Sequence, residues 1–303
     1  MSSYARVIVN PAAGAGRTGR NWPRIMSLFR RHGLRFEHAI TEAPGHATEL
    51  AKEAARRGYE TVVSVGGDGT VNEIVNGLHT AGDSRDTRLG IISTGTGSDY
   101  IRTLGIPRRC EEACRRLIAA KHRAVDLGVA EYSVDGHREV RLFVNFAGMG
   151  FDAEIVRRTT QQFKSLGGLP AYLCGVLATV VAYKNKSIRL TLDGETMDKK
   201  VCTVIMNIGR YGGGGMKTAP GAIVDDGMFD VLVIGDVSKP DLLRSLPRIY
   251  RGTHLSHPKV TLKKAKEIEI DSGQPVRLQA DGELLGRVPA RFHILPSALN
   301  VIV

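Results

Sequence analysis

Residues 61–70 read TVVSVGGDGT, a run of β-branched residues that ends in three glycines around one aspartate. A run rich in valine and threonine is typical of a strand, and glycines directly after it predict a tight turn. The first third of the chain repeats this alternation, with strand-like runs at residues 7–9, 36–41 and 89–93 and helix-like runs at 22–32, 46–57 and 71–79. Strands and helices that alternate in this way predict an α/β domain with a parallel sheet and helices on both of its faces.

The pattern changes after Asp126. Most of the remaining chain consists of strand-like runs separated by short turns, at residues 139–146, 187–192, 200–208, 228–234, 259–261, 267–270 and 275–280. Two helix-like insertions, residues 167–183 and 239–250, interrupt them. This pattern predicts an all-β sandwich. We expect an α/β domain over residues 1–127 and a β-sandwich over 128–290, and the sequence leaves open whether residues 291–303 return to the first domain.

The composition restricts the partners. The formal net charge is +11, which indicates an anionic partner such as nucleic acid, nucleotide phosphate or acidic lipid. Aromatic residues make up only 6% of the 303 residues and no nucleic-acid motif is present, so we expect no nucleic-acid binding. No apolar run reaches the roughly 18 residues of a membrane-spanning helix, and the first residues show no signal-peptide pattern. We therefore expect a cytoplasmic protein.

The glycine cluster at residues 66–70 is typical of a phosphate-binding turn, because backbone amides and the following helix N-terminus can surround an anion. Asp68 inside it would repel phosphate unless a magnesium ion lies between them. Residues 14–19 also match the dinucleotide pattern G-x-G-x-x-G, with Glu37 as a candidate ribose-binding acid. That match is weak, because residues 10–13 are inserted before the glycines, and the chain has no P-loop lysine.

The motifs occur in a defined order: NPAAGAG at 10–16, GGDGT at 66–70, TGTGSD at 94–99, GMGFDA at 148–153, GGGG at 212–215, APGA at 219–222, DDGMFDV at 225–231 and DGE at 281–283. This set resembles the diacylglycerol kinase catalytic family, specifically the soluble bacterial lipid kinases, with sphingosine and ceramide kinases as relatives. The resemblance covers essentially the whole chain. It implies an N-terminal domain similar to NAD kinase and phosphofructokinase, a C-terminal β-sandwich, and an active site in the cleft between them.

The resemblance also implies roles for single residues. ATP would be surrounded by Asn10, Thr41, Gly66, Gly67, Asp68, Gly69, Thr70, Val71, Asn72 and Thr94. The catalytic Mg²⁺ would be held, largely through water, by Asp68, Asp99 and Asp126. A second, structural metal would be bound by Asp226 with the backbone carbonyls of Ile223 and Met228. Glu283 would be the general base, and Asp68 would be the other catalytic residue.

Two details affect these roles. The tripeptide Asp-Gly-Glu occurs twice, and we interpret the copy ending at Glu195 as a turn and the copy ending at Glu283 as catalytic, because only the second lies in the ordered motif set. Ser98 stands where many members of the family have asparagine, and Tyr100 replaces a common phenylalanine. Serine keeps a hydrogen-bonding side chain, so we expect the activity to survive.

The acceptor would be a lipid hydroxyl, with diacylglycerol as the first candidate and a sphingoid base, monoacylglycerol or phosphatidylglycerol as alternatives. The apolar residues 169–183 could line an acyl groove, rest on a membrane or pack in the core. Arg157, Arg158 and Lys184 near it would attract an anionic membrane, so we expect peripheral contact with one. Rival hypotheses are an NAD-kinase-like small-metabolite kinase and an inactive nucleotide- or lipid-binding module, and a homodimer is left open.

Overall fold

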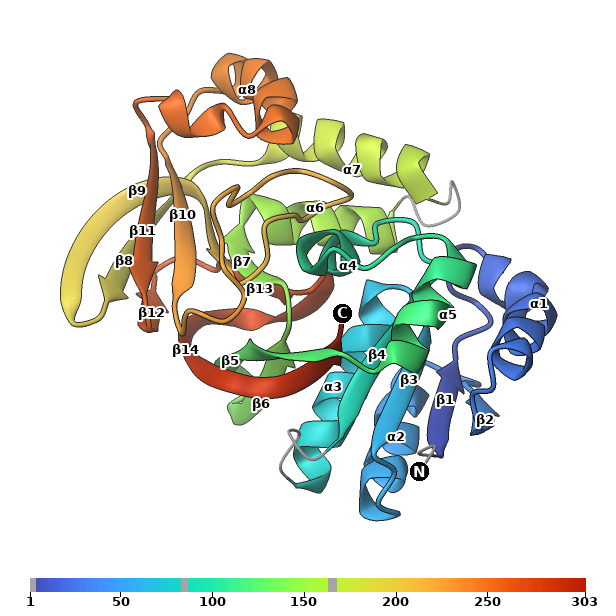
Figure 1. Ribbon diagram of the computed structural model, residues 1–303. Coiled ribbons are helices and arrows are strands. Elements are labelled where there is room, and N and C mark those ends of the chain that lie inside the picture. The colour runs from blue at the N-terminus through green and yellow to red at the C-terminus, as the bar shows by residue number, and fades with distance from the viewer. Residues whose placement is uncertain (1–3, 83–86, 163–167) are drawn as a thin grey trace. The chain divides into compact units, whose positions relative to one another are not determined.

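The computed structural model describes residues 4–82, 87–162 and 168–303 (Figure 1). The chain forms two compact units: unit 1 comprises Met1–Leu127 and Pro296–Val303, and unit 2 comprises Gly128–Leu295. Two strands, β5 (His122–Val134) and β14 (Glu283–Ile302), continue from one unit into the other. Gly167, where the sequence predicts the first helical insertion to begin, lies outside the described residues.

Unit 1 is built on a parallel sheet. Its strands lie in the order β2 (Phe36–Ile40), β1 (Ala5–Val9), β3 (Thr61–Gly66) and β4 (Arg88–Ser93), and the end of β14 pairs with β4 through Val301 and Leu89. Every residue of β3 is buried, which explains its nearly continuous apolar sequence. The predicted α/β domain is confirmed.

Helices cover both faces of this sheet (Figure 1). Trp22, Ile25 and Phe29 of α1 (Arg17–Arg31) and Leu117 of α5 (Cys110–Ala119) pack on alternate residues of β1 and β3 in one apolar cluster. On the opposite face, α2 (His46–Arg56) packs against α3 (Asp68–Ala81). A short helix, α4 (Asp99–Leu104), follows the loop after β4. The carboxyl ends of β1, β3 and β4 therefore point to one edge, where their loops gather.

Unit 2 is an antiparallel β-sandwich, as predicted. Besides β5 and β14 its strands are β6 (His137–Phe143), β7 (Phe146–Gly150), β8 (Lys186–Leu192), β9 (Glu195–Asn207), β10 (Phe229–Gly235), β11 (Val260–Ala265), β12 (Glu267–Asp271) and β13 (Arg277–Ala280). One ladder runs β11-β10-β9-β7-β13-β14, and β14 also pairs with β12 and β5. Its helices are α6 (Phe151–Gln161), α7 (Gly168–Ala182), α8 (Lys239–Arg251) and the 3₁₀ turn η2 (His254–Ser256).

Two local predictions for unit 2 were wrong. The single strand expected at residues 139–146 is divided into β6 and β7, because the Asp281 carboxylate accepts hydrogen bonds from the backbone amides of residues 144–146 and removes them from the ladder. Helix α6 was not predicted at all. Phe151 and Ile155 form its buried side, and a four-residue spacing that occurs once is too short to be distinguished from a strand.

Among the described residues, no helix combines the length and the apolar character needed to cross a bilayer.

The contact between α2 and α3 generates a stability prediction. A Cβ added at Gly77 of α3 would lie 2.2 Å from the carbonyl oxygen of Thr48 in α2. Ala normally stabilises a helix interior by about 1 kcal/mol relative to Gly. In Gly77→Ala the overpacking outweighs that gain, and we expect a net loss of about 1–2 kcal/mol of unfolding free energy in denaturant titration. Gly19→Ala in α1, whose Cβ would stay 3.3 Å from Pro11, is the control. A Gly77→Ala protein as stable as wild type would contradict this packing.

Candidate active site

The glycine-rich loop joins β3 to α3 at the carboxyl edge of the unit 1 sheet. Gly66 is the last residue of β3, Asp68 is the first of α3, and the residues 67–69 are half-exposed. A Cβ at Gly66 would lie 2.5 Å from the Thr70 hydroxyl, so this position requires glycine. The first amides of α3 have no partner within the helix and point toward the loop, which is the arrangement that binds phosphate.

The loops after β1 and β4 are hydrogen-bonded to this one. The Asn10 side chain donates to the Thr70 hydroxyl over 3.0 Å, and the Thr94 amide donates to the Gly66 carbonyl over 2.8 Å. A Cβ at Gly95 would lie only 2.7 Å from the Cα of Gly67, so two glycine backbones are in direct contact. Three loops that are far apart in the sequence thus form one rigid edge.

Two of the three predicted magnesium carboxylates lie together. A Cβ placed at Gly97 would be 3.1 Å from Oδ2 of Asp68 and 3.6 Å from Oδ2 of Asp99, so both oxygens face the same glycine. Asp68 also accepts hydrogen bonds from the amides of Asp99 and Tyr100 at the start of α4. Asp99 is buried and its carboxylate is 3.2 Å from the Arg102 guanidinium. The two carboxylates could share a cation.

The remaining predicted residues of unit 1 have other environments. Asp126 is buried on β5, and its carboxylate accepts the Ser297 amide over 2.8 Å. Thr41 is buried beside β1, and the side chains of Val71 and Asn72 are buried in α3, so they could reach a nucleotide only through their backbone. Within the described residues no group of three His, Cys, Asp or Glu side chains is placed to hold a metal. Magnesium held through water by Asp68, Asp99 and Asp126 stays a prediction.

Ser98, which stands where many members of the family have asparagine, occupies an unusual backbone conformation. Ser98 is the N-cap of α4 with φ 57° and ψ 38°, in the left-handed region where asparagine is favoured over most other residues. Its hydroxyl lies 2.8 Å from that of Ser93. The serine therefore accepts a strained backbone conformation and is held in it by a side-chain hydrogen bond.

In unit 2, Glu283 follows a turn that is fixed at several points. Asp281 and Gly282 have φ values of 47° and 85°, and the Asp281 carboxylate accepts three backbone amides at 2.8–3.0 Å. The Gly282 amide donates to the Gln279 side chain, which in turn donates to the buried carboxylate of Asp152 over 2.8 Å. Burial is the main cause of a raised pKa at Asp152. The GMGFDA motif thus supports the Asp-Gly-Glu turn.

The Glu283 carboxylate itself is paired with an arginine. Its Oε2 is 2.6 Å from the guanidinium of Arg141 on β6. Neither Arg141 nor Gln279 belongs to a motif, and no feature of the sequence could have identified them.

The second Asp-Gly-Glu tripeptide forms the same kind of turn without this setting. Asp193 and Gly194 have φ values of 46° and 88° and join β8 to β9, and Asp193 accepts the amides of Lys266 and Glu267. Glu195 is largely exposed and is 3.4 Å from Lys263. The local fold of the two turns is the same, so the difference between them lies in their surroundings.

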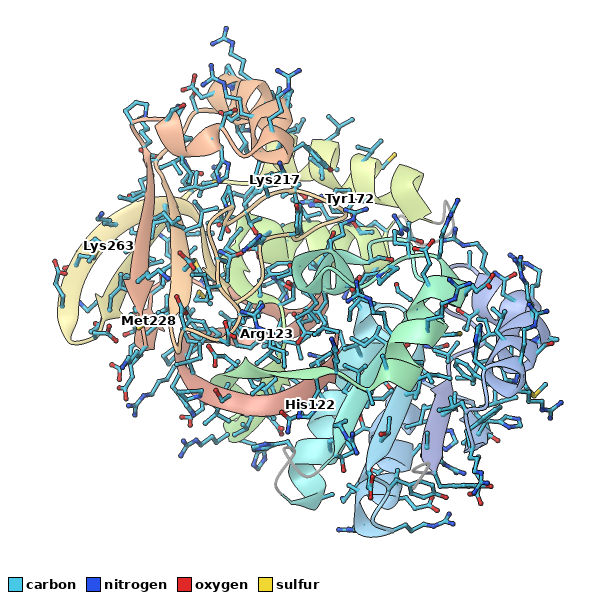
Figure 2. The ribbon with its side chains drawn as sticks, viewed as in Figure 1. His122, Arg123, Tyr172, Lys217, Met228 and Lys263 are labelled. Atoms are coloured by element: carbon cyan, nitrogen blue, oxygen red, sulfur yellow. The ribbon has the colours of Figure 1, made fainter. Side chains whose placement is uncertain are left out.

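At the predicted second metal site a lysine provides the positive charge. The Lys264 ammonium of β11 contacts the Asp226 carboxylate and is 3.7 Å from Asp230, which is 6% exposed. The other Asp226 oxygen accepts the amide of Met228, a residue labelled in Figure 2. A divalent ion at Asp226 would have to displace this ammonium. The metal at Ile223, Asp226 and Met228 stays a prediction.

Unit 2 also contains an apolar cavity between β9 and the helices α6, α7 and α8. Its walls are mainly Phe151, Ile155, Tyr172, Val176, Cys202, Ile205, Leu242, Leu246 and Ile249. Tyr172, labelled in Figure 2, directs its hydroxyl toward the Met216 sulfur, 3.8 Å away. His254 also lines the cavity, and burial lowers its pKa, so its ring is neutral. A cavity with such walls suits a hydrocarbon chain.

Comparisons with known proteins find a matching family domain for each of the two units. Residues 4–130 match the diacylglycerol kinase catalytic domain, and residues 145–303 match the YegS C-terminal NAD kinase beta sandwich-like domain. The diacylglycerol kinase of Bacillus subtilis (strain 168) is 29% identical, with 99% of this chain and 96% of the relative covered. That of Staphylococcus haemolyticus (strain JCSC1435) is 31% identical, with 99% and 88% covered. A crystal structure of a diacylglycerol kinase from Bacillus anthracis str. Sterne has a TM-score of 0.73 at 22% identity, with 99% and 96% covered.

Fold, loops and matches together define an enzyme of the lipid kinase class, with an NAD-kinase-like α/β domain and a β-sandwich. The match extends over nearly the full length of this chain and of its relatives. The chain belongs to the diacylglycerol kinase family, and the resemblance inferred from its motifs is confirmed.

The environment of Lys264 generates a second prediction. Lys264→Met leaves Asp226 and the buried Asp230 without their counter-ion, and we expect a loss of about 1–2 kcal/mol at neutral pH, allowing for the partial exposure of the lysine. Because burial raises the pKa of Asp230, the loss should shrink as the pH falls and Asp230 takes up a proton. The control is Lys263→Met, which removes an exposed pair and should change little. Thermal unfolding with and without Mg²⁺ provides the measurement, and equal stability of the two variants would contradict the role of Lys264.

Proposed function

We propose that this protein transfers the γ-phosphoryl group of ATP to the hydroxyl of a lipid, with diacylglycerol as acceptor and Mg²⁺ as the required ion. Unit 1 would be the nucleotide-binding domain and unit 2 the lipid-substrate domain. The observation that carries the proposal is the convergence of Asp68 and Asp99 on Gly97, beside a glycine loop with free helix N-terminal amides. A phosphate loop with two carboxylates beside it suits a metal–nucleotide complex.

In this proposal the three loops at the carboxyl edge of the unit 1 sheet position the nucleotide. Gly66 to Gly69 bring backbone amides to the phosphates, and Asn10 and Thr94 hold the neighbouring loops in register. Asp68 and Asp99 would hold the magnesium ion, which when bound neutralises phosphate charge. Asp68 has a second task, because it also fixes the start of α4. Phosphoryl transfer depends mainly on such positioning and charge neutralisation.

Glu283 would accept the proton of the attacking hydroxyl. Its position is fixed from one side by the Asp281 turn and from the other by Arg141. The arginine holds the carboxylate in one orientation. A general base in this position contributes about 10²–10⁴-fold to the rate of a reaction whose nucleophile is an alcohol.

The apolar cavity of unit 2 would receive part of an acyl chain. Most of its wall is aliphatic or aromatic, and burial lowers the pKa of His254, which favours its neutral ring, so the cavity suits hydrocarbon. We infer that the acceptor reaches the enzyme from an anionic membrane surface. A soluble acceptor such as NAD would leave this cavity without a role, and that distinguishes the proposal from an NAD-kinase-like activity.

The test is transfer of labelled phosphate from Mg²⁺-ATP to a panel of lipids in detergent micelles, with NAD as a competing acceptor. We expect labelled phosphatidic acid. Glu283→Gln should lower kcat about 10²–10⁴-fold with little change in the KM for ATP. Glu195→Gln in the matching turn should leave both constants unchanged. Label found in NADP alone, or an active Glu283→Gln enzyme, would overturn the proposal.

The cavity yields a separate prediction. Val176→Phe adds volume to its wall, so long acyl chains should bind less well while chains of about eight carbons are less affected. We expect the KM for a long-chain diacylglycerol to rise about tenfold, the loss of roughly two buried methylenes. The ratio of the two KM values is the readout, since it is insensitive to a general loss of active protein. An unchanged ratio would exclude this cavity as the acyl site.

A further inference from the structure

Helices α7 and α8 carry several large apolar side chains that are more than two-fifths exposed. On α7 these are Leu173, Leu177 and Val181, which recur every four residues and are 49%, 56% and 71% exposed. On α8 Leu243 and Tyr250 are 44% and 42% exposed. Exposed apolar side chains gathered on neighbouring elements mark an interaction surface more often than chance exposure does.

The two helices lie side by side (Figure 1). The Lys239 ammonium at the start of α8 donates to the carbonyl of Val181 at the end of α7. Their inner sides pack in one cluster, with Val176 and Val180 from α7 and Leu242 and Leu246 from α8. Since the inner sides share a core, the exposed side chains of both helices are on the outside of the same pair.

The α7–α8 pair carries mainly positive charge. Helix α8 has four basic residues and one acidic residue, and α7 has no charged residue. The acidic residue, Asp241, is engaged by the Ser238 hydroxyl at 2.7 Å and lies 3.9 Å from Arg244. Arg244 is 79% exposed, and Arg248 and Arg251 form no ion pair with any residue that the structure describes. Leu243 and Tyr250 form an apolar strip along α8, and the three arginines occupy the adjacent strip.

We propose that the outer side of the α7–α8 pair is the surface that docks the protein on an anionic lipid bilayer. We call it the docking face, and it comprises Leu173, Leu177, Val181, Leu243, Tyr250 and the arginines 244, 248 and 251. An apolar strip bordered by arginines is the pattern of helices that lie in the membrane interface, with aliphatic stems buried and charged ends at the headgroups. The docking face deepens the proposed function and rests on it, since it supplies the lipid route.

Two observations favour a bilayer over other occupants. The inner sides of the same helices form walls of the apolar cavity, through Tyr172, Val176, Leu246 and Ile249. A lipid drawn from a bilayer under the docking face would therefore be next to that cavity. A second copy of the chain is less suited to the face, because the three arginines would bring six positive charges into one interface with only Asp241 of each α8 to offset them.

Of the three basic residues that the sequence suggests for membrane contact, Lys184 is exposed, whereas the two arginines are not. Arg157 and Arg158 both contact Glu154, at 2.6 and 3.4 Å, and their side chains are only 18% exposed. Their charge is thus compensated and largely withdrawn from the surface.

The experiment is flotation of the purified protein with vesicles of phosphatidylglycerol and phosphatidylcholine, and with phosphatidylcholine alone. Wild type should float with the anionic vesicles and should be released by salt. Each arginine close to an anionic bilayer strengthens vesicle binding about fivefold, so R244E/R248E should weaken vesicle binding about 25-fold or more. The matched control is R30E/R31E, which makes the same charge change on exposed positions of α1 in unit 1. L177S tests the apolar part and should weaken binding without altering the salt dependence.

Activity on a short-chain diacylglycerol in detergent micelles separates this proposal from the kinase function. We expect R244E/R248E to retain wild-type micellar activity and melting temperature, and to lose activity on vesicles. Vesicle binding without any lipid phosphorylation would support docking and overturn the kinase proposal. Docking is overturned if wild type floats with neither vesicle, if R244E/R248E floats like wild type, or if R30E/R31E is equally impaired. A dimer that R244E/R248E dissociates, with no vesicle binding, would assign the face to a second copy.

Discussion

The turn that carries Glu283 in unit 2 depends on one carboxylate, that of Asp281. By accepting three consecutive backbone amides it ends β6, starts β7 and fixes the left-handed turn that precedes Glu283. A carboxylate saturated by amides is strongly held. The backbone of Glu283 therefore follows a turn that is fixed in the sandwich. Its carboxylate is oriented by the ion pair with Arg141.

The loops of unit 1 depend on a different constraint, the contact between glycine backbones. A Cβ at Gly95 would lie 2.7 Å from the Cα of Gly67, so position 95 has no room for a methyl group, and a Cβ at Gly66 would collide with the Thr70 side chain. Here the residues act by having no side chain. The edge can therefore offer backbone amides, which are donors with fixed positions, and Asp68 and Asp99 add two carboxylates beside Gly97.

Sequence patterns predicted the parts of this protein that repeat or that form contiguous motifs. The run at 61–66 identified a buried parallel strand, and the ordered glycine motifs identified the family. The patterns failed where a long-range contact decides the local structure: the division of β6 from β7 is imposed by Asp281, some 137 residues away. Arg141 and Gln279 act through neighbours that are distant in sequence, and Lys264 belongs to no motif although it lies between two aspartates.

The return of β14 to unit 1 has a consequence for how the chain matures. Leu299, Val301 and Ile302 are fully buried there, and the amide of Val303 donates to the carbonyl of Lys121. These residues follow the whole of unit 2 in the chain, so during synthesis unit 1 cannot complete its sheet until unit 2 has been translated. Folding of unit 1 is thus tied to the synthesis of unit 2, and the nascent α/β half has to wait with an open edge at β4 for its final strand.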